Sequence, residues 1–103
     1  MKILNLNLYR KYFDQIAEGT KTLEYRDRTE YWKKRIENRE YDYIKFRNGY
    51  AKDAPIMLVE YKGWIKATTA EKIDVCPYYT ENQVYALKLG KVLEVNYNGK
   101  DNE

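Results

Sequence analysis

The sequence predicts one small α+β domain built on a curled sheet. Its 103 residues fit a single domain with one modest core. Hydrophobic residues make up 44% and charged residues 34% of the chain, which is typical of a globular protein rather than a disordered one. Five or six short segments have strand-like patterns, and two or three others have helical spacing.

The first three elements come from the first quarter of the chain. Leucines alternate with asparagines over residues 4–8, which predicts a half-buried strand. Apolar residues recur at helical spacing over residues 9–17, and Gly19 suits the end of that helix. Residues 21–26 include threonine, leucine and tyrosine and predict a short strand.

The middle of the chain predicts a second helix and two strands. Residues 31–37 (YWKKRIE) favour a short helix that Thr29 can cap. Residues 41–47 alternate as a strand does, and Asn48-Gly49 predicts a turn after it. Residues 56–61 (IMLVEY) form the most continuous apolar run and predict a central strand that extends towards Ile65.

The last third predicts shorter elements. We expect a helical turn over residues 68–74 and a loop over residues 75–82, which contain Pro77. A strand is predicted over residues 84–89, and Gly90 then permits a sharp bend into a strand over residues 92–95.

Missing residue types exclude several kinds of chemistry. The chain has no His and no Ser, so a histidine base, a histidine metal site and a Ser-His-Asp triad are excluded. Cys76 is the single cysteine, which excludes an internal disulfide and a multi-cysteine zinc site, and we expect it to be a buried filler. We expect no metal and no cofactor. No apolar run near the N-terminus is long enough for a signal peptide, so we expect a cytoplasmic protein without membrane contact.

Positive charge is concentrated in the first half of the chain. Residues 1–52 hold thirteen basic and eight acidic residues, whereas residues 53–103 hold six and eight, and all six arginines lie in the first half. Arginine presents a planar fork of donors that suits phosphates and base edges. Among tyrosines and tryptophan, this points to an anionic, ring-bearing ligand. A solvated face with internal ion pairs is the alternative.

Residues 19–26 (GTKTLEYR) contain the pattern G-x-K-x-x-E-x-R and resemble the signature of the ASCH domain family. Residues 41–50, 54–64 and 84–95 also resemble strands of that family, so the resemblance covers residues 1–97, with 98–103 as a flexible C-terminal tail. The resemblance implies a PUA-like, small, mostly antiparallel β-barrel with flanking short helices and a cleft lined by the signature.

The signature residues make chemical sense as a binding site. On a strand, Glu24 and Arg26 share a face, where the acid can accept from a base amino group and the Arg can donate to a carbonyl or phosphate. Lys21 directly follows the helix end and can swing into a cleft. The alternative is a structural ion pair between Glu24 and one of the two cations that closes the barrel.

Three further residues are candidates for ligand binding. Tyr31 and Arg35 lie four residues apart on one face of the predicted helix, and we expect that face to join the cleft. Trp32 and Ile36, on the neighbouring face, are expected to pack the helix onto the barrel. Arg47 lies beside the predicted turn, where its side chain either lines the cleft or only stabilises the hairpin.

Family members are associated with RNA binding, RNA cleavage and, in some cases, deacetylation of acetylcytidine by a Lys, a Thr and a Glu. Lys21 matches that lysine, whereas Glu24 stands where those enzymes have the catalytic Thr, and their Glu has no match here. An opposite charge beside Lys21 favours the ammonium form, which suits binding rather than base catalysis.

The resemblance therefore implies an RNA- or nucleotide-binding module, whose ligand is RNA or a nucleoside or nucleotide. The alternatives are a hydrolase that acts on a modified nucleoside or on RNA, with Lys21 and Glu24 as its candidate catalytic residues, and a protein-interaction adaptor.

Overall fold

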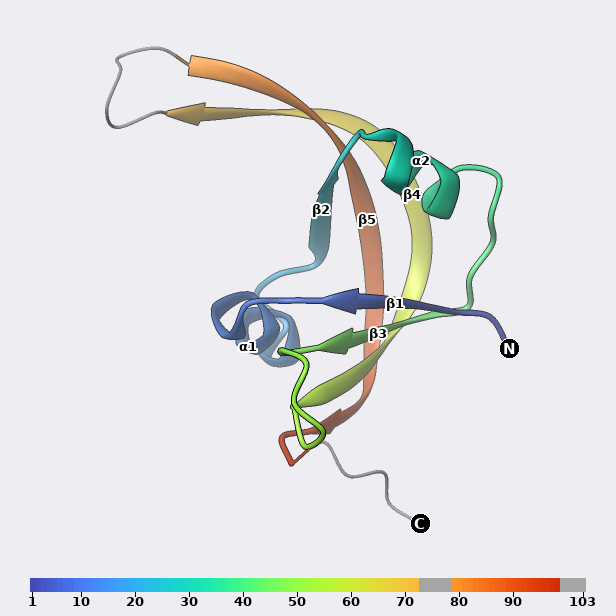
Figure 1. Ribbon diagram of the computed structural model, residues 1–103, viewed down its shortest axis with the longest axis vertical. Coiled ribbons are helices and arrows are strands. Elements are labelled where there is room, and N and C mark those ends of the chain that lie inside the picture. The colour runs from blue at the N-terminus through green and yellow to red at the C-terminus, as the bar shows by residue number, and fades with distance from the viewer. Residues whose placement is uncertain (73–78, 99–103) are drawn as a thin grey trace.

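The computed structural model describes residues 1–72 and 79–98, which form an α+β domain with five strands and two short helices (Figure 1). This confirms the predicted α+β class with a curled sheet. The elements in chain order are β1 (Ile3–Asn7), α1 (Arg10–Glu18), β2 (Leu23–Asp27), α2 (Glu30–Ile36), β3 (Tyr43–Arg47), β4 (Ile56–Lys72) and β5 (Tyr79–Asn96).

The strands form one curled, mixed sheet in the order β1-β3-β4-β5-β2 (Figure 1). Strands β1 and β3 run parallel, and the other three neighbouring pairs run antiparallel. Strands β1 and β2 are the two edges of the sheet. The sheet therefore curls like part of a barrel, but among the described residues no backbone ladder joins its two edges.

The core lies on the inner face of this curl. Both helices contribute to it: Phe13 and Ile16 of α1 and Ile36 of α2 are almost completely buried. The sheet contributes buried side chains from four strands, namely Leu4, Leu6, Ile44, Phe46, Met57, Val59, Tyr85 and Leu87. Alternate residues of β1 and β3 are buried, as the period-two pattern predicted.

The ends of the helices have the residues that the sequence predicted. Gly19 ends α1 in the left-handed conformation with φ = +84°, which a residue with a Cβ adopts rarely. At the start of α2, the Thr29 hydroxyl accepts a hydrogen bond from the backbone N–H of Trp32. The Gly19 cap ends α1 shortly before β2, and the Thr29 cap starts α2 shortly after β2.

The two longest strands depart from the prediction. The expected helical turn over residues 68–74 is wrong as far as it is described, because 68–72 belong to β4. The expected loop over 75–82 is likewise wrong for 79–82, which belong to β5. Cross-strand pairing outweighs the helical propensity of this Ala-Glu-Lys segment. Figure 1 shows the far ends of both strands extending beyond the rest of the sheet.

Gly90 does not separate two strands, because β5 continues through it to Asn96. The pairing register with β4 shifts here: Leu89 pairs with Tyr61, and Val92 pairs with Val59. A Cβ at Gly90 would lie 2.7 Å from the Lys62 Cε and 3.0 Å from the Glu60 Cβ, so the glycine leaves room for these two side chains at an irregularity of the ladder.

Two predictions lie outside the described residues. These are the burial of Cys76 and nearly all of the tail over residues 98–103. In the described part of the chain, neither helix has the length and apolar character needed to cross a membrane.

Candidate functional site

The inner face of β2 carries charge where the neighbouring strand is apolar. Glu24 lies opposite Leu87 of β5, and Arg26 lies opposite Tyr85. Both partners belong to the core cluster. Directly opposed residues of antiparallel strands point to the same side of the sheet, so Glu24 and Arg26 project towards the interior. Glu24 is only 5% exposed, which makes it an uncommon buried carboxylate.

Two cations compensate the buried carboxylate. The Arg26 Nε and Nη2 donate to the Glu24 Oε2 at 3.1 and 2.7 Å. The Lys21 Nζ lies 3.6 Å from the other oxygen, Oε1. A buried charge without a partner costs several kcal/mol, and this pairing removes much of that cost. Two positive charges against one negative charge leave the cluster with a surplus of one positive charge.

Arg26 also bridges the gap between the two edges of the sheet. Its Nη2 donates to the backbone carbonyl of Asn7, at the end of β1, at 2.9 Å. The ion pair between Glu24 and Arg26, the structural alternative drawn from the sequence, is therefore present, and Arg26 also contacts the opposite edge of the sheet. These contacts engage Nε and Nη2 of Arg26, and Nη1 makes no hydrogen bond to the described part of the chain.

Lys21 is the less constrained of the two cations. Its backbone N–H donates to Gln15 at the end of α1, which fixes the base of the side chain. Its Nζ lies 5.5 Å from the centre of the Tyr12 ring and 5.1 Å from that of Tyr25. Within residues 1–72 and 79–98 the ammonium group makes no hydrogen bond, so all three of its N–H groups can serve a ligand.

Lys21, Glu24 and Arg26 line one open cleft of about 740 Å³. Five aromatic side chains also line it, namely Tyr9, Tyr12, Tyr25, Trp32 and Tyr50. Tyr9 and Tyr50 are more than four-fifths exposed, so their ring faces are accessible. The cleft therefore combines a charged floor with aromatic walls. The described residues contain no group of three or more acidic, His or Cys side chains that could hold a metal ion.

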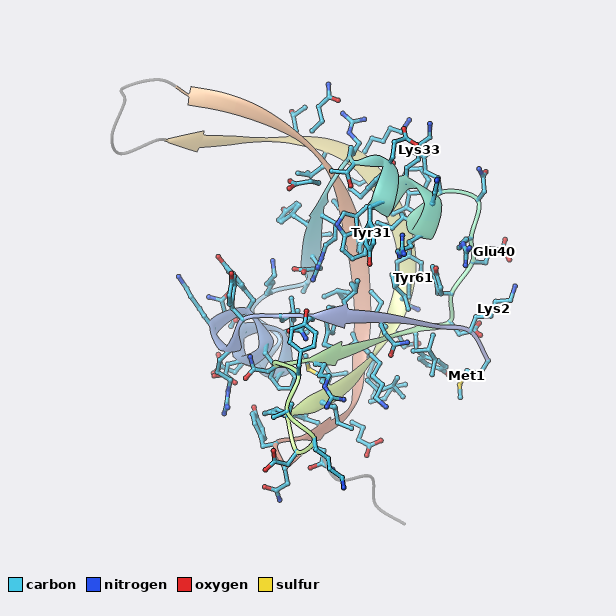
Figure 2. All side chains as sticks on the ribbon, in the orientation of Figure 1. Met1, Lys2, Tyr31, Lys33, Glu40 and Tyr61 are labelled. Atoms are coloured by element: carbon cyan, nitrogen blue, oxygen red, sulfur yellow. The ribbon has the colours of Figure 1, made fainter. Side chains whose placement is uncertain are left out.

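The other predicted binding residues lie beside this cleft rather than in it. Tyr31 and Arg47 line a neighbouring groove of about 390 Å³, which shares Arg26 and Trp32 with the cleft. Arg35 lines neither cavity, but its guanidinium stacks 3.5 Å from the centre of the Tyr31 ring. Figure 2 shows Tyr31 between α2 and β1.

Helix α2 is attached through the face that was expected to pack. Ile36 is fully buried, and Trp32 packs against the core cluster. Trp32 also lines both cavities, and the Arg26 guanidinium lies 5.1 Å from the centre of its ring. It thus anchors the helix and forms a wall of the cleft.

Sequence reasoning missed the aromatic walls. Tyr12 and Tyr25 flank the Lys21 ammonium, and Asn7 receives Arg26, yet none of the three was singled out. Tyr12 counted only as a helix residue and Tyr25 only as a strand residue. The signal that was available is composition, since twelve tyrosines in 103 residues supply many ring faces.

No protein-family model, no curated protein and no solved structure matches the chain. The ASCH resemblance and the activities that it implies therefore stay predictions.

Proposed function

We propose that this protein binds a nucleotide or a short stretch of RNA in the cleft of Lys21, Glu24 and Arg26. One observation carries the proposal: a buried carboxylate with two cations forms the floor of an open cleft that has aromatic walls. A nucleotide offers the complementary groups, namely a flat base, amino and carbonyl groups on its edge, and a phosphate.

Each part of the cleft has a chemical role in this proposal. The Glu24 Oε2 accepts from Arg26, whereas Oε1 keeps capacity to accept from a base amino group. The Lys21 ammonium and the Arg26 Nη1 donate to a base carbonyl or to a phosphate. Tyr12, Tyr25 or Trp32 stacks on the base. The cleft should therefore prefer a base that carries an exocyclic amino group.

The resemblance of residues 19–26 to the ASCH signature supports the same proposal, because its four defined residues include three of the four charged residues that line the cleft, the fourth being Asp27. We include in the proposal that the curled sheet is a PUA-like barrel of that family. The cation-rich first half of the chain, which contributes β1, β2 and α2, is consistent with an anionic ligand.

Binding is favoured over hydrolysis by the surroundings of Lys21. Its ammonium forms an ion pair with the Glu24 carboxylate and lies over the Tyr12 and Tyr25 rings, an arrangement that suits the binding of a phosphate or carbonyl group. Thr20 and Thr22 flank Lys21 in sequence, but both are exposed and neither lines the cleft. The cleft thus lacks an activated nucleophile among its described residues.

Fluorescence of Trp32 tests the proposal. The chain has two tryptophans, so Trp64→Phe leaves Trp32 as the single tryptophan reporter, at the wall of the cleft. Titration with cytidine and uridine monophosphates and with a short mixed-sequence RNA should quench or shift its emission. Cytidine monophosphate should bind roughly tenfold more tightly than the uridine form, which lacks the amino group facing Glu24.

Matched variants locate the binding. Lys21→Ala and Glu24→Gln should weaken binding, whereas Lys91→Ala, an exposed lysine on β5 away from the cleft, should not. The proposal fails if none of the three ligands changes the emission. It also fails if Lys21→Ala binds as tightly as Lys91→Ala.

A further inference from the structure

A second groove continues the candidate cleft along the molecule. It lies between α2 and the β1–β3 side of the sheet and is lined by Tyr31, Lys45 and Arg47. Asn7, Arg26, Trp32 and Tyr50 line both cavities, so the two are neighbours. The stacked pair of Arg26 and Trp32 forms the ridge between them. A ligand that crosses this ridge contacts both cavities.

Rings and cations alternate from one cavity to the other. Lys21 lies between Tyr12 and Tyr25 in the cleft, and Arg26 covers Trp32 on the ridge. Beyond the ridge, Trp32 meets Tyr31 edge to face with ring centres 4.9 Å apart, and Arg35 covers Tyr31. Such a series of ring faces and cations is what a single nucleic-acid strand contacts with successive bases and phosphates.

The two cavities differ in their charge balance. The cleft contains the carboxylates Glu24 and Asp27, whereas the lining of the second groove includes three cations and no carboxylate. Arg26 is already paired with Glu24. The Lys45 ammonium has neither a hydrogen bond nor an ion pair within residues 1–72 and 79–98. The second groove thus offers positive charge to a phosphate without a competing acid.

Arg47 contributes charge and also holds the groove in shape. Its Nε donates to the Gly49 carbonyl at 3.0 Å, and its Nη2 donates to the Ala51 carbonyl. Its substitution would therefore disturb the loop between β3 and β4. Lys45 and the 56% exposed Tyr31 are better probes, because neither is part of the buried core.

We infer that the ligand is a single strand of nucleic acid that spans both cavities, rather than a free nucleoside or mononucleotide. One base occupies the cleft, the following phosphate crosses the Arg26–Trp32 ridge to meet Lys45, and the next base stacks on Tyr31. This inference rests on the proposed function, since it extends the same site. The phosphodiester chain and the base faces are common to RNA and DNA, so either sugar can satisfy the contacts.

The test compares cytidine monophosphate with a six-nucleotide RNA and with a DNA of the same sequence, by equilibrium binding at several salt concentrations. The strand should bind at least roughly tenfold more tightly than the monophosphate. The dependence of the logarithm of its affinity on the logarithm of salt should be steeper by about 0.7 for each added phosphate contact. Binding of either sugar form at this level supports the inference, and their ratio identifies the natural strand.

Variants in the second groove make the result specific. Lys45→Ala should reduce the salt slope for the strand by about 0.7, and Tyr31→Ala should weaken strand binding roughly tenfold. Neither should change the affinity for cytidine monophosphate, and Lys91→Ala should change neither ligand.

The outcomes separate this inference from the proposed function. If strand and monophosphate bind equally, or if Lys45→Ala and Tyr31→Ala leave strand binding unchanged, the inference is overturned while the proposed function stands. If no nucleotide and no strand binds, both fall. Competition by a polyglutamate peptide as effective as that by the RNA would also overturn the inference, because charge alone would then explain the binding.

Discussion

The two sides of the curled sheet are held together differently. From β1 through β3, β4 and β5 to β2, backbone ladders join each strand to the next over an apolar inner face. Across the gap between β1 and β2, the described contact between the strand edges is the Arg26 side chain donating to the Asn7 carbonyl. The first side is held by backbone pairing and burial, and the second by one charged side chain.

The difference indicates where a small domain can keep a binding site. Tyr85 and Leu87 of β5 are core residues, whereas Arg26 and Glu24, directly opposite on β2, line a cleft. The change occurs over one strand spacing, at the edge where the ladder ends. Charged groups can be partly buried there because they pair with each other and still face an opening.

The largest expected effect lies on the side held by ladders. Phe46 of β3 is fully buried. Phe46→Ala should lower the free energy of unfolding by about 3–5 kcal/mol, because it removes buried apolar area and leaves a cavity. Urea denaturation followed by circular dichroism measures this loss. A loss below about 1 kcal/mol would mean that this side of the sheet does not carry the stability.

Substitution in the gap should have a smaller effect. Arg26→Ala removes both the closest partner of the buried Glu24 and the contact to Asn7, and we expect a loss of about 1–3 kcal/mol. Lys21→Ala should cost less than about 1 kcal/mol, because its nitrogen lies 3.6 Å from the carboxylate and makes no hydrogen bond to it. The same urea experiment compares them, and a larger loss for Lys21→Ala would contradict the division of roles.

A separate effect is expected at alkaline pH, and it comes from the side held by ladders. Burial raises the pKa of Tyr61 and of Tyr85 to about 12, and a hydrogen bond to Glu37 adds to the shift of Tyr85. A folded pKa above the unfolded value of about 10 stabilises the fold fully below pH 10. This stabilisation is lost as the pH rises from about 10 to about 12.

Absorbance at 295 nm measures that titration. The native protein should show a late phase near pH 12 that is absent in urea, and Tyr85→Phe should reduce it. A native titration that ends near pH 10 would contradict the burial of these hydroxyls.

We expect no substantial deacetylase activity. The protein should release little or no acetate from acetylcytidine, because Lys21 is paired with Glu24 and no activated nucleophile lines the described cleft. Acetate release over time is measured against Lys21→Ala as the blank. Robust turnover by the natural protein that Lys21→Ala abolishes would place hydrolysis ahead of binding. Glu24→Thr alone should not restore full activity, since the third residue of those enzymes has no match.

Local patterns predicted the parts of the molecule that local interactions determine. The spacing of Lys21, Glu24 and Arg26 was enough to predict that they meet, because all three lie within six residues. The helix end at Gly19 and the cap at Thr29 were predicted for the same reason. Tyr31 and Arg35 were expected to share a helix face, and they stack.

The sequence patterns did not predict how strands that are distant in the chain pair with one another. Alternation in residues 4–8 and 41–47 predicts strands but carries no direction, so the parallel pairing of β1 with β3 was missed. The far part of β4 was predicted to be a helical turn, because the helical propensity of its residues carries no information about their pairing with β5. Tyr12 meets Lys21 only through the packing of α1, which no local pattern records.

The central claim, that the gap between β1 and β2 holds the ligand, is tested most directly by mapping backbone amide shifts of labelled protein during titration with the six-nucleotide RNA. We predict that the shifts concentrate on Lys21–Asp27, Asn7–Tyr12, Tyr31, Trp32 and Lys45, while the amides of Glu60 and Lys91, on the side held by ladders, stay unchanged. Shifts that concentrate on β4 and β5 with none on β2 would contradict the account.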